Sequence, residues 1–509
     1  MSPTPIPVVD IFAGAGGLGE GFDAFARGQE ASGPFHVAMS AEMDRHAVNT
    51  LRTRAFYRSF AAREVPKSYY EYLAGQRAEP WTSETEQIWR QATGRVWQLT
   101  LGDPNDDRIL DERIGKIASG ARKKDLPWVL IGGPPCQAFS LVGRARNRGI
   151  AGYVPEEDDR HYLYEHYLHI LSRHRPAAFV LENVKGMLSS QIDGSNIFEE
   201  IFDSLQHPGG RKGPRYRIVP ILQSSQHSGA RHPKDFIVRS ERLGLPQTRH
   251  RVILVGVLEG LLTDFQRIAE TGDAPTVADM IYSLPDIRSC STDEDIRSWR
   301  AFSPRILTDC ARLARCIDAE TARYLRQLAS IARSGDELDS GAPWMPGKPK
   351  GKLPAHLDGF MRDSRLNGVI QHQARSHMTS DLMRYAYAAA FAHVHGHSPR
   401  GAAEFPQELH PNHKSWKRSD RFVDRFKVQR AGAPSSTITS HLAKDGHYFI
   451  HPDPLQVRSL TVREAARLQT FPDNYFFEGP PGSQRKQVGN AVPPWLGHQI
   501  AKVIKQILI

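Results

Sequence analysis

The sequence predicts an α/β protein whose main domain is built on a mostly parallel β-sheet. Two observations support this class. Short apolar runs of strand length recur along the first half of the chain, and several of them lead through turns into segments with helical apolar spacing. Continuous apolar runs are typical of strands buried on both faces of a parallel sheet. The runs are residues 7–13, 35–41, 128–131, 176–181 and 252–256.

The alternation of strands and helices stops near residue 258 and returns near residue 460. Between these points Gly, Pro, His, Arg and Lys become frequent, and the apolar periodicity weakens. We therefore expect residues 1–257 and 456–509 to form one domain together. Residues 258–455 are expected to form a smaller, irregular domain with a basic face.

The composition narrows the class of protein further. Among 509 residues, 66 Lys and Arg outnumber 56 Asp and Glu, which leaves a net charge of +10. This balance fits a polyanionic partner such as nucleic acid, although a merely basic protein would show it too. The four cysteines form no CxxC pair, which favours the cytoplasm. No apolar run approaches the roughly 20 residues that a membrane span requires, and no secretory leader is recognisable.

The first strand, residues 7–13, runs into a glycine-rich turn. Gly14, Gly16 and Gly19 fit G-x-G-x-x-G, and the apolar spacing that follows predicts a helix. Such a corner lets the backbone approach a ligand while the helix end offers N–H groups. Alone, the motif fits a dinucleotide site as well as any other nucleotide-type site.

Acidic residues follow the next two predicted strands. Glu42 stands at the tip of the strand 35–41, where a carboxylate suits bonding to ribose hydroxyls. Asp44 nearby could equally cap the next helix. Residues 99–103 are predicted to be a third strand that brings Asp103 to the same crevice. Asp103 could accept a hydrogen bond from an adenine amino group, or serve only as a turn residue.

The fourth strand, residues 128–131, ends in the rigid turn Gly132–Pro135, and Cys136 follows directly. Open α/β sheets place their chemistry outside the carboxyl ends of strands. Cys136 could therefore be a nucleophile, whereas an arbitrary cysteine is more often a small buried hydrophobe. The basic segment 143–149 could close over a phosphate backbone, or be an ordinary solvated loop.

Charged residues also end the later strands. Glu182 follows the strand 176–181 and is expected to face the same crevice, although such a residue is often only a cap or an ion-pair partner. Gln247, Arg249 and Arg251 alternate before the last strand and would share one face. Two arginines in a crevice are costly unless an anion or a polar partner lies nearby.

The rest of the chain adds two helices and a turn. Residues 381–393 are predicted to be a helix in the middle domain. Residues 461–469 are predicted to be another, with Thr461 and Glu464 forming a capping box. A turn at 487–494 then leads into a closing helix. Five histidines between residues 372 and 397 match no zinc pattern, so we expect no metal.

Six blocks in this order resemble the DNA cytosine-5 methyltransferases from end to end. The resemblance implies a Rossmann-like, S-adenosylmethionine-dependent methyltransferase domain, with residues 258–455 as the target-recognition domain. The bases would be read between Gly368 and His441, but the recognition sequence itself is not predicted. The blocks are residues 10–17, 133–137, 182–184, 247–251, 463–469 and 487–494.

The resemblance also implies roles for individual residues. Cys136 would be the nucleophile, and three residues would hold the flipped cytosine: Glu182, Arg249 and Arg251. The residues expected to line S-adenosylmethionine are Phe12, Gly14, Gly16, Gly17, Glu42, Asp103, Pro135 and Asn490. The residues expected to contact DNA are Gln137, Ser140, Arg144, Arg146 and Gln247. Pro104 departs from the family pattern, which makes Asp103 the least secure of the cofactor contacts.

The expected activity is methyl transfer to C5 of a flipped cytosine in a specific duplex DNA sequence, through a covalent Cys136–C6 adduct. The expected role is protection of host DNA in a restriction–modification system, with an orphan or phage-defence role as the alternative. We expect a monomer that acts on double-stranded DNA, with a restriction endonuclease for the same site as a further partner. Competing readings are an RNA methyltransferase of the same family, an inactive DNA-binding regulator and a nicotinamide-dependent dehydrogenase.

Overall fold

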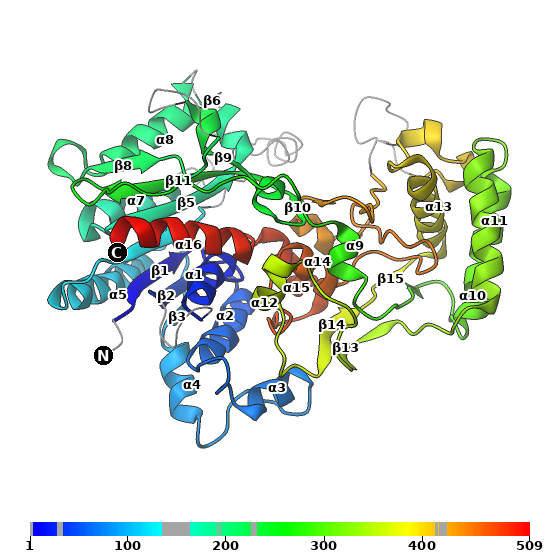
Figure 1. The fold of residues 1–509 in the computed structure, drawn as a ribbon, viewed down its shortest axis with the longest axis horizontal. Helices are drawn as coiled ribbons and strands as arrows, with labels where there is room; N and C mark the ends of the chain where they lie inside the picture. The colour runs from blue at the N-terminus through cyan, green and yellow to red at the C-terminus, as the bar shows by residue number, and fades with distance from the viewer. Residues whose placement is uncertain are drawn as a thin grey trace.

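A computed structural model describes residues 4–27, 34–134, 163–189, 191–192, 195–224, 232–412, 416 and 425–509. Its centre is an eight-stranded sheet in the order β3-β2-β1-β4-β5-β11-β8, with β9 also paired to β11 (Figure 1). The strands of this sheet are β1 (Ile6–Ile11), β2 (Phe35–Glu42), β3 (Val96–Gln98), β4 (Val129–Gly132), β5 (Ala178–Val184), β8 (Tyr216–Val219), β9 (Ile237–Arg239) and β11 (His250–Leu258).

The sheet is mostly parallel, as the sequence predicts. Strands β1 to β5 run in the same direction, whereas β11 is antiparallel to β5, β8 and β9. Ile11 pairs with Ala41 and Gly132, and Gly132 pairs with Leu181. This register brings the carboxyl ends of β1, β2, β4 and β5 to one edge. The strand order reverses between β1 and β4, and open α/β sheets bind their ligands beside such a point.

Helices cover both faces of the sheet. On one face, α1 (Gly17–Arg27) and α16 (Pro494–Leu508) share a core with the sheet. On the other face, a second core includes α5 (Pro104–Lys123), α7 (Leu163–His174) and α8 (Ile197–Gln206). Figure 1 shows the last helix, α16, lying beside the first. A Cβ on Gly21 would lie 2.4 Å from the backbone of Gly497, so glycine lets these two helices approach closely.

The predicted third strand is wrong in position. Strand β3 covers Val96–Gln98, and residues 99–103 form a turn in which the Asp103 N–H bonds to the Thr100 carbonyl. Gly102 has a φ of +99°, which breaks the extended conformation there. The polar stretch before β3 contains α2 (Arg45–Arg58), α3 (Lys67–Leu73) and α4 (Glu86–Thr93).

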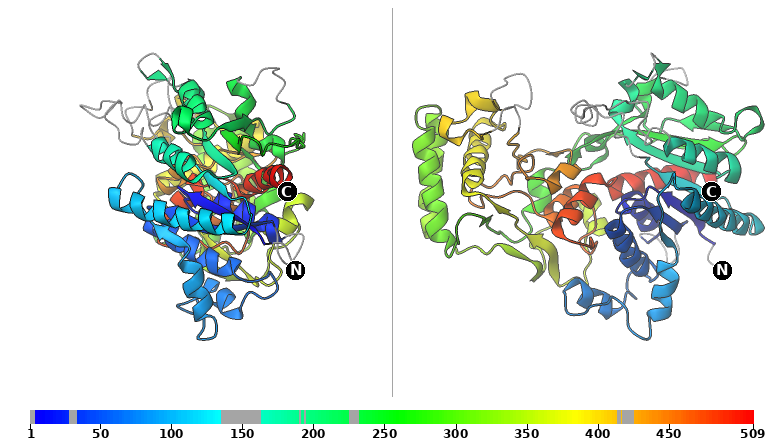
Figure 2. Two further views of the ribbon diagram at one scale, coloured as in Figure 1. Left: turned by 90° about the vertical axis from the view of Figure 1, so that its left-hand side faces the viewer. Right: turned by 180° about the vertical axis from the view of Figure 1, so that it is seen from behind.

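The segment 258–455 divides its apolar residues among three cores, the smallest of which takes Leu366 and Ile370. A core of its own includes α10 (Trp299–Ala314), α11 (Ala319–Ser334) and α13 (Thr379–His395). Figures 1 and 2 show these three helices at the end of the molecule far from the sheet. Helix α13 contains the predicted helix 381–393. In contrast, α9 (Val277–Ile281) and α12 (Ala355–Met361) pack with the first core of the sheet domain.

Short pairs of strands complete the fold. Among the described residues, the antiparallel pairs are β13 (Gly341–Pro346) with β14 (Gly368–Gln373), and β6 (Gln191–Ile192) with β7 (Ser195–Asn196). The parallel pairs are β12 (Cys290–Ser291) with β15 (Ser376–His377), and β10 (Gln247–Thr248) with β16 (Ser435–Ser436). The last pair joins the sheet domain to the middle segment.

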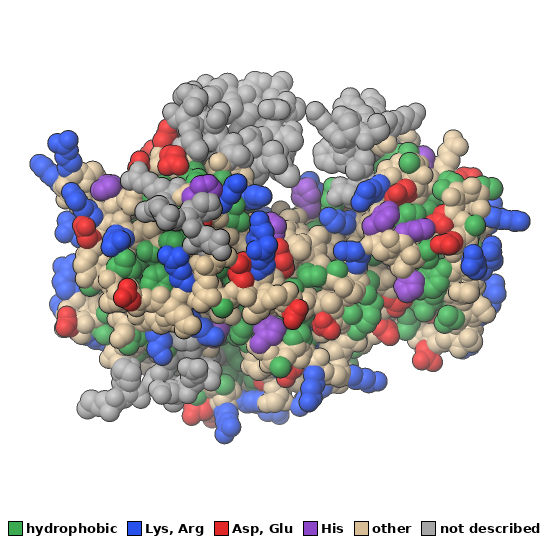
Figure 3. Space-filling model, turned by 45° about the horizontal axis from the view of Figure 1, so that its top comes forward, with side chains coloured by type: hydrophobic (Ala, Val, Ile, Leu, Met, Phe, Trp, Pro, Cys, Tyr) green, Lys and Arg blue, Asp and Glu red, His purple; other side chains and the backbone are tan. Residues whose placement is uncertain are grey.

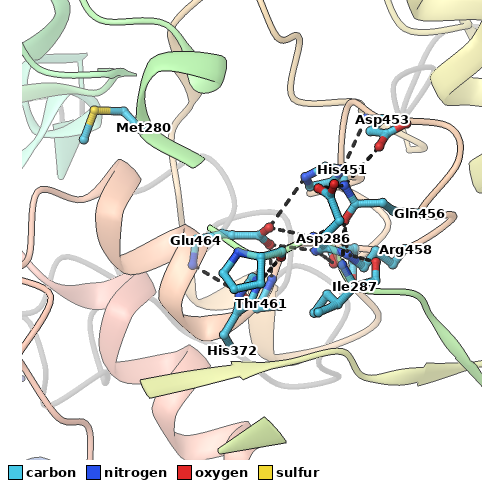
Figure 4. A network of polar contacts seen from close by, with 12 residues as sticks. Met280, Asp286, Ile287, His372, His451, Asp453, Gln456, Arg458, Thr461 and Glu464 are labelled. Carbon is cyan, nitrogen blue, oxygen red and sulfur yellow. Dashed lines mark hydrogen bonds and ion pairs between the residues drawn. The ribbon is translucent and has the colours of Figure 1, made fainter. Parts of the chain in front are cut away.

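Helix α14 (Val462–Leu468) and helix α15 (Pro481–Asn490) lie between the sheet and the three distant helices (Figure 1). The predicted capping box is present: the Thr461 side chain accepts from the Glu464 N–H, and Glu464 accepts from the Thr461 N–H. Glu464 also forms two hydrogen bonds of 2.7 Å with the buried guanidinium of Arg458 (Figure 4). His372 and His451 belong to the same buried network, which ties α14 to the middle segment.

Within the described ranges, no helix has both the length and the apolar character needed to cross a bilayer. Over the same residues, no group of three or more His, Cys, Asp or Glu side chains is arranged to hold a metal ion.

Candidate active site at the carboxyl edge of the sheet

The loop between β1 and α1 turns sharply. Phe12, Gly14 and Gly16 all have positive φ, at 53°, 55° and 76°. Glycine adopts this conformation freely, whereas a bulky residue such as Phe12 does so only under constraint from its surroundings. Such constraint is found mostly at functional sites. The loop therefore presents its backbone, rather than side chains, toward the carboxyl edge.

The C-terminal part of the chain encloses this loop. A Cβ on Gly17 would lie 1.9 Å from the carbonyl oxygen of Val492, so only glycine fits at this contact. The Tyr475 hydroxyl donates a hydrogen bond to the carbonyl of Ala15. Asn490 is exposed at the end of α15, two residues before Val492. The fold thus brings the predicted cofactor residue Asn490 next to the glycine loop, although some 470 residues separate them.

Glu42 stands at the end of β2, beside the same loop. Its Oε2 accepts the Gly14 N–H at 2.8 Å, and its Oε1 accepts the Asp44 N–H at 2.9 Å. A carboxylate offers about four acceptor positions, so both oxygens can still accept from hydroxyl groups. Asp44 caps α2, as the alternative interpretation of that residue allowed.

Asp103 is exposed and caps α5. Its Oδ1 accepts the N–H groups of Asn105 and Asp106 at 2.9 and 3.1 Å. The structure therefore bears out the alternative of a turn and cap residue, and Pro104 fills the first position of the helix. A contact from Asp103 to the cofactor stays a prediction.

Asp10 is a buried carboxyl group that the sequence alone did not single out. It lies in β1, one residue before the strand ends, and its side chain is packed against Gly19 of α1. Burial, with a smaller contribution from the charge of Glu42, raises the pKa of Asp10 to about 7. Arg58 and the Gly19 N–H act in the opposite direction. Asp10 therefore titrates near neutral pH, directly beneath the glycine loop.

Glu182 and Arg251 meet at the ends of β5 and β11. Arg251 Nε lies 2.9 Å from Glu182 Oε1, and both side chains are largely buried. Within the described part of the chain this oxygen has no aligned hydrogen-bond donor, so the contact is an ion pair. A Cβ on Gly133 would lie 3.0 Å from Glu182 Oε2. The carboxylate therefore lies against the chain immediately after β4.

Six predicted site residues lie outside the described residues: Pro135, Cys136, Gln137, Ser140, Arg144 and Arg146. The description ends at Pro134, two residues before Cys136. Gly133 lies against Glu182. The last described residues before Cys136 are therefore next to the carboxylate that is expected to act with this cysteine.

Gln247 and Arg249 are not placed as predicted. Gln247 is fully buried: its Nε2 donates to the Leu468 carbonyl and to Gln469 Oε1, while its Oε1 accepts the Ile438 N–H. Both ends of the amide are thus used inside the protein in this structure, and a contact from Gln247 to DNA stays a prediction. Arg249 is 2% exposed and donates to the Ile438 carbonyl at 2.9 Å.

Gln247 and Arg249 thus hold both the N–H and the carbonyl of Ile438. Arg249 donates to the Ile438 carbonyl in the segment 435–438, and Arg251 forms the ion pair with Glu182. Gln469 extends the connection, because its Nε2 donates to the Val488 carbonyl at 2.8 Å, two residues before Asn490. Sequence reasoning placed Gln469 in a helix but found no role for it; its only signal was membership of the block 463–469.

The face above these strands is hollowed between the two halves of the molecule (Figure 3). Lys and Arg side chains, together with histidines, gather around this hollow. Positive charge beside a cleft attracts polyanions and raises their local concentration.

The strand order, the glycine loop and the carboxylate at the end of β2 define a Rossmann-like methyltransferase domain. The family model "C-5 cytosine-specific DNA methylase" matches residues 106–300 and 360–506, and the chain belongs to this family. Its activity is that of a DNA (cytosine-5-)-methyltransferase, with S-adenosylmethionine as the implied methyl donor and DNA as the implied substrate.

Individual relatives agree with this assignment. The chain is 32% identical to the type II methyltransferase M.Bpa9945I of Bacillus paralicheniformis, over 98% of this chain and 99% of that protein. It is 29% identical to the type II methyltransferase M.AgeI of Thalassovita gelatinovora, over 74% and 82%. A solved structure of a candidate DNA modification methyltransferase from an E. coli prophage has a TM-score of 0.53 and 21% identity, over 99% of both chains, which supports the fold.

Proposed function

We propose that this protein methylates C5 of a flipped-out cytosine in a specific duplex DNA sequence through a covalent Cys136–C6 adduct. The observation that carries the proposal is the Glu182–Arg251 ion pair of 2.9 Å, set against Gly133 just before the Pro-Cys turn. This arrangement supplies a carboxyl group and a guanidinium at the strand end from which Cys136 extends.

The chemistry needs these groups together. Cytosine C5 is a poor nucleophile, but adding a thiolate to C6 makes an enamine whose C5 is nucleophilic. A cysteine suits this step because its thiolate forms near neutral pH. Glu182 would share a proton with N3 and so remove charge from the adduct, while Arg251 would bond to O2 and hold Glu182 in place. After transfer, a base or water takes the C5 proton and the thiol leaves.

The glycine loop fits S-adenosylmethionine, which supplies an electrophilic methyl group when bound. Gly14 and Gly16 leave the backbone open at the carboxyl edge, and Gly17 admits the Val492 carbonyl behind it. Glu42 would accept hydrogen bonds from the ribose hydroxyls, since its carboxylate retains acceptor capacity. Asn490 would close the site from the C-terminal side.

The duplex must release the target base, because neither C5 nor C6 can be reached inside the stack. Unstacking costs a few kcal/mol, which contacts to the DNA backbone can offset. The basic hollow of Figure 3 supports binding of the duplex between the two halves of the molecule. In this arrangement Arg249 and Gln247 act as positioning residues, because they hold the segment at Ile438.

We also propose a role in protecting host DNA within a restriction–modification system. The similarity to type II methyltransferases along the full chain supports this role. A restriction endonuclease for the same DNA site would then be the functional partner, and the methyltransferase would act as a cytoplasmic monomer. Metal is not required by any step above.

Cys136→Ala tests the proposal directly. Transfer of a radiolabelled methyl group to DNA should be lost, whereas Cys316→Ala, at an exposed cysteine in the turn between α10 and α11, should keep full activity. Glu182→Gln should lower kcat by roughly 10²- to 10⁴-fold, the usual contribution of a general acid or base. Wild-type protein should form a covalent adduct with DNA that contains 5-fluorocytosine. Methylation by Cys136→Ala would overturn the mechanism.

Expression in an unmethylated bacterial host tests the sequence specificity. Mapping of 5-methylcytosine should show one recurring sequence context, and digestion by an endonuclease of that specificity should be blocked. Scattered methylation without a common context would contradict the restriction–modification role.

A further inference from the structure

Helix α15 contains a buried arginine that lacks a partner. Arg485 is only 6% exposed, and its Nε is enclosed without a hydrogen-bond acceptor. In the part of the chain that the structure describes, no carboxylate forms an ion pair with this guanidinium. Burying an unpaired charge is costly, so buried cations are normally paired or bind a ligand. Arg485 is therefore a candidate for binding an anion from outside the protein.

Helix α15, which carries Arg485, packs against the 3-10 helix η10 (Ser440–Ala443). Gly489 lies four residues further along α15 and so on the same helical face. A Cβ on Gly489 would lie 2.2 Å from the carbonyl carbon of Thr439 and 2.4 Å from the amide nitrogen of Ser440. Arg485 lies one turn earlier on this face of α15.

A second arginine holds the other end of η10. Arg375 donates from Nη1 to the Leu442 carbonyl at 3.2 Å and from Nη2 to the Lys444 carbonyl at 2.6 Å. A 3-10 helix rises about 2 Å per residue, so its four residues span only roughly 8 Å. Arg375 therefore contacts the same short helix as α15, the helix that carries Arg485.

The electrostatics agree with this proximity. Burial, together with the positive charge of Arg375, lowers the pKa of Arg485 to about 10. Both arginines also help to lower the pKa of His377, which packs against Gly446 just beyond η10. The carboxylate that acts on Arg375 is Asp445, which also accepts the His447 N–H. One carboxylate does not balance the positive charges of the two arginines.

We propose that Arg375 and Arg485 form a pocket for one backbone phosphate of the DNA substrate. Two guanidinium groups suit a phosphate because each can offer paired N–H donors. The pocket also has a defined place in the site, because η10 begins two residues after Ile438, which Gln247 and Arg249 hold. A phosphate bound here would lie beside the segment at Ile438, which Gln247 and Arg249 hold against the strand that leads to Arg251. The proposal rests on the proposed function only in taking DNA as the source of the anion.

Arg485→Met removes the charge while keeping an unbranched chain of similar length. Binding of a short fluorescein-labelled duplex should weaken by about tenfold, and the slope of log Kd against log salt should fall by about one. In methylation assays the KM for DNA should rise while kcat stays unchanged. Without DNA the thermal midpoint should stay the same or rise, because a buried uncompensated charge has been removed.

Two further variants make the test specific. Arg485→Lys keeps the charge but loses the planar fork, so the salt slope should be retained and the affinity loss should be smaller. Arg323→Met removes an exposed arginine from the outer face of α11 and should change neither affinity nor salt slope. If Arg485→Met does not fold, the affinity and the salt slope of Arg485→Lys still test the pocket.

Several results would overturn the proposal. Arg485→Met could bind the duplex with wild-type affinity and salt slope, which would show that the pocket holds no DNA phosphate. Inorganic phosphate could raise the thermal midpoint of the wild type but not of Arg485→Met while DNA binding is the same for both, which would identify a free-anion site. Failure of the proposed function looks different, because then the wild type itself would methylate no DNA.

Discussion

The Nε2 of Gln247 lies 2.9 Å from Oε1 of Gln469, and neither side chain is exposed to solvent. The pair joins three segments that are distant in the sequence. Gln247 accepts from the Ile438 N–H, and Gln469 donates to the Val488 carbonyl. The segment before Arg251 is thereby linked both to the middle segment and to helix α15, which ends at Asn490.

Gln247→Leu should destabilise the protein and leave its base preference unchanged. The substitution leaves the buried N–H of Ile438 without its acceptor, which costs about 1–3 kcal/mol. Urea unfolding would measure the loss, and Gln327→Leu on the exposed face of α11 is a matched control. Normal stability together with an altered methylation context would instead restore a base-reading role for Gln247.

Gly17→Ala should weaken cofactor binding by displacing the C-terminal segment. The added Cβ would meet the Val492 carbonyl oxygen at 1.9 Å, so one of the two backbones must move. Overpacking of this kind typically costs about 1–3 kcal/mol. Isothermal titration with S-adenosylmethionine should show at least a roughly tenfold loss of affinity, equal to about 1.4 kcal/mol.

Gly120→Ala provides the matched control for that experiment. Gly120 lies in α5, and a Cβ there would have no heavy atom within 4 Å. Alanine is favoured over glycine in a helix interior by roughly 0.5–1 kcal/mol. The control should therefore bind the cofactor normally and unfold at a slightly higher temperature. Equal affinities for the two alanine variants would contradict the steric role of Gly17.

Asp10 should make the protein less stable as the pH rises from about 4 to about 7. Its pKa is about 7 in the folded state, against an ordinary value of 3.8. Between these values the native state holds a proton that the unfolded state has lost, so unfolding is favoured as pH rises. A shift of this size corresponds to on the order of 4 kcal/mol.

Asp10→Asn removes the titration while keeping the shape of the side chain. Unfolding should be measured from pH 4 to pH 8 for both proteins, with the difference taken at each pH to cancel the other titrating groups. The variant should gain relative stability through that range and reach a plateau above the folded pKa of about 7. A constant difference across the whole range would show that Asp10 ionises normally.

The carboxyl edge of the sheet was predictable because it depends on local patterns. Each apolar run with its terminal Gly or Glu implies a strand end, and parallel strands place those ends together. This reasoning located Glu42 beside the glycine loop and Glu182 near the end of β4. The joint role of Glu182 and Arg251 was expected only from the family resemblance; the structure accounts for it, because β5 and β11 are neighbours with a register that brings their charged ends together.

Contacts between distant segments were not predictable in the same way. Alternation placed Gln247 and Arg249 on one face, but it did not reveal that β16 pairs with β10 and brings Ile438 onto that face. The core formed by α10, α11 and α13 was not predicted, because the sequence analysis recognised only α13 as a helix in this segment. Asp10 was missed for another reason: its pKa depends on complete burial, which no short motif encodes.

The Arg458–Glu464 pair provides a last test, at the junction of the two cores. Its two hydrogen bonds of 2.7 Å are almost inaccessible to solvent. Burial alone would raise the pKa of Glu464, but the charge of Arg458 outweighs it and holds the pKa well below the usual range. The pair therefore stabilises the fold above the ordinary pKa of glutamate, and this stability is lost only as pH falls toward the lowered value.

Arg458→Met should cost about 3–5 kcal/mol at neutral pH, because it leaves a buried carboxylate without its counter-charge. Combining it with Glu464→Gln should recover part of that loss, since the amide oxygen can still accept the Thr461 N–H that Glu464 accepts at 2.7 Å. A double-mutant cycle from urea unfolding measures the coupling. Because the network of Figure 4 joins α14 to the middle segment, Arg458→Met should also loosen the hold on that segment and raise the KM for DNA. Additive effects of the two substitutions would show that the pair contributes no coupling to this junction.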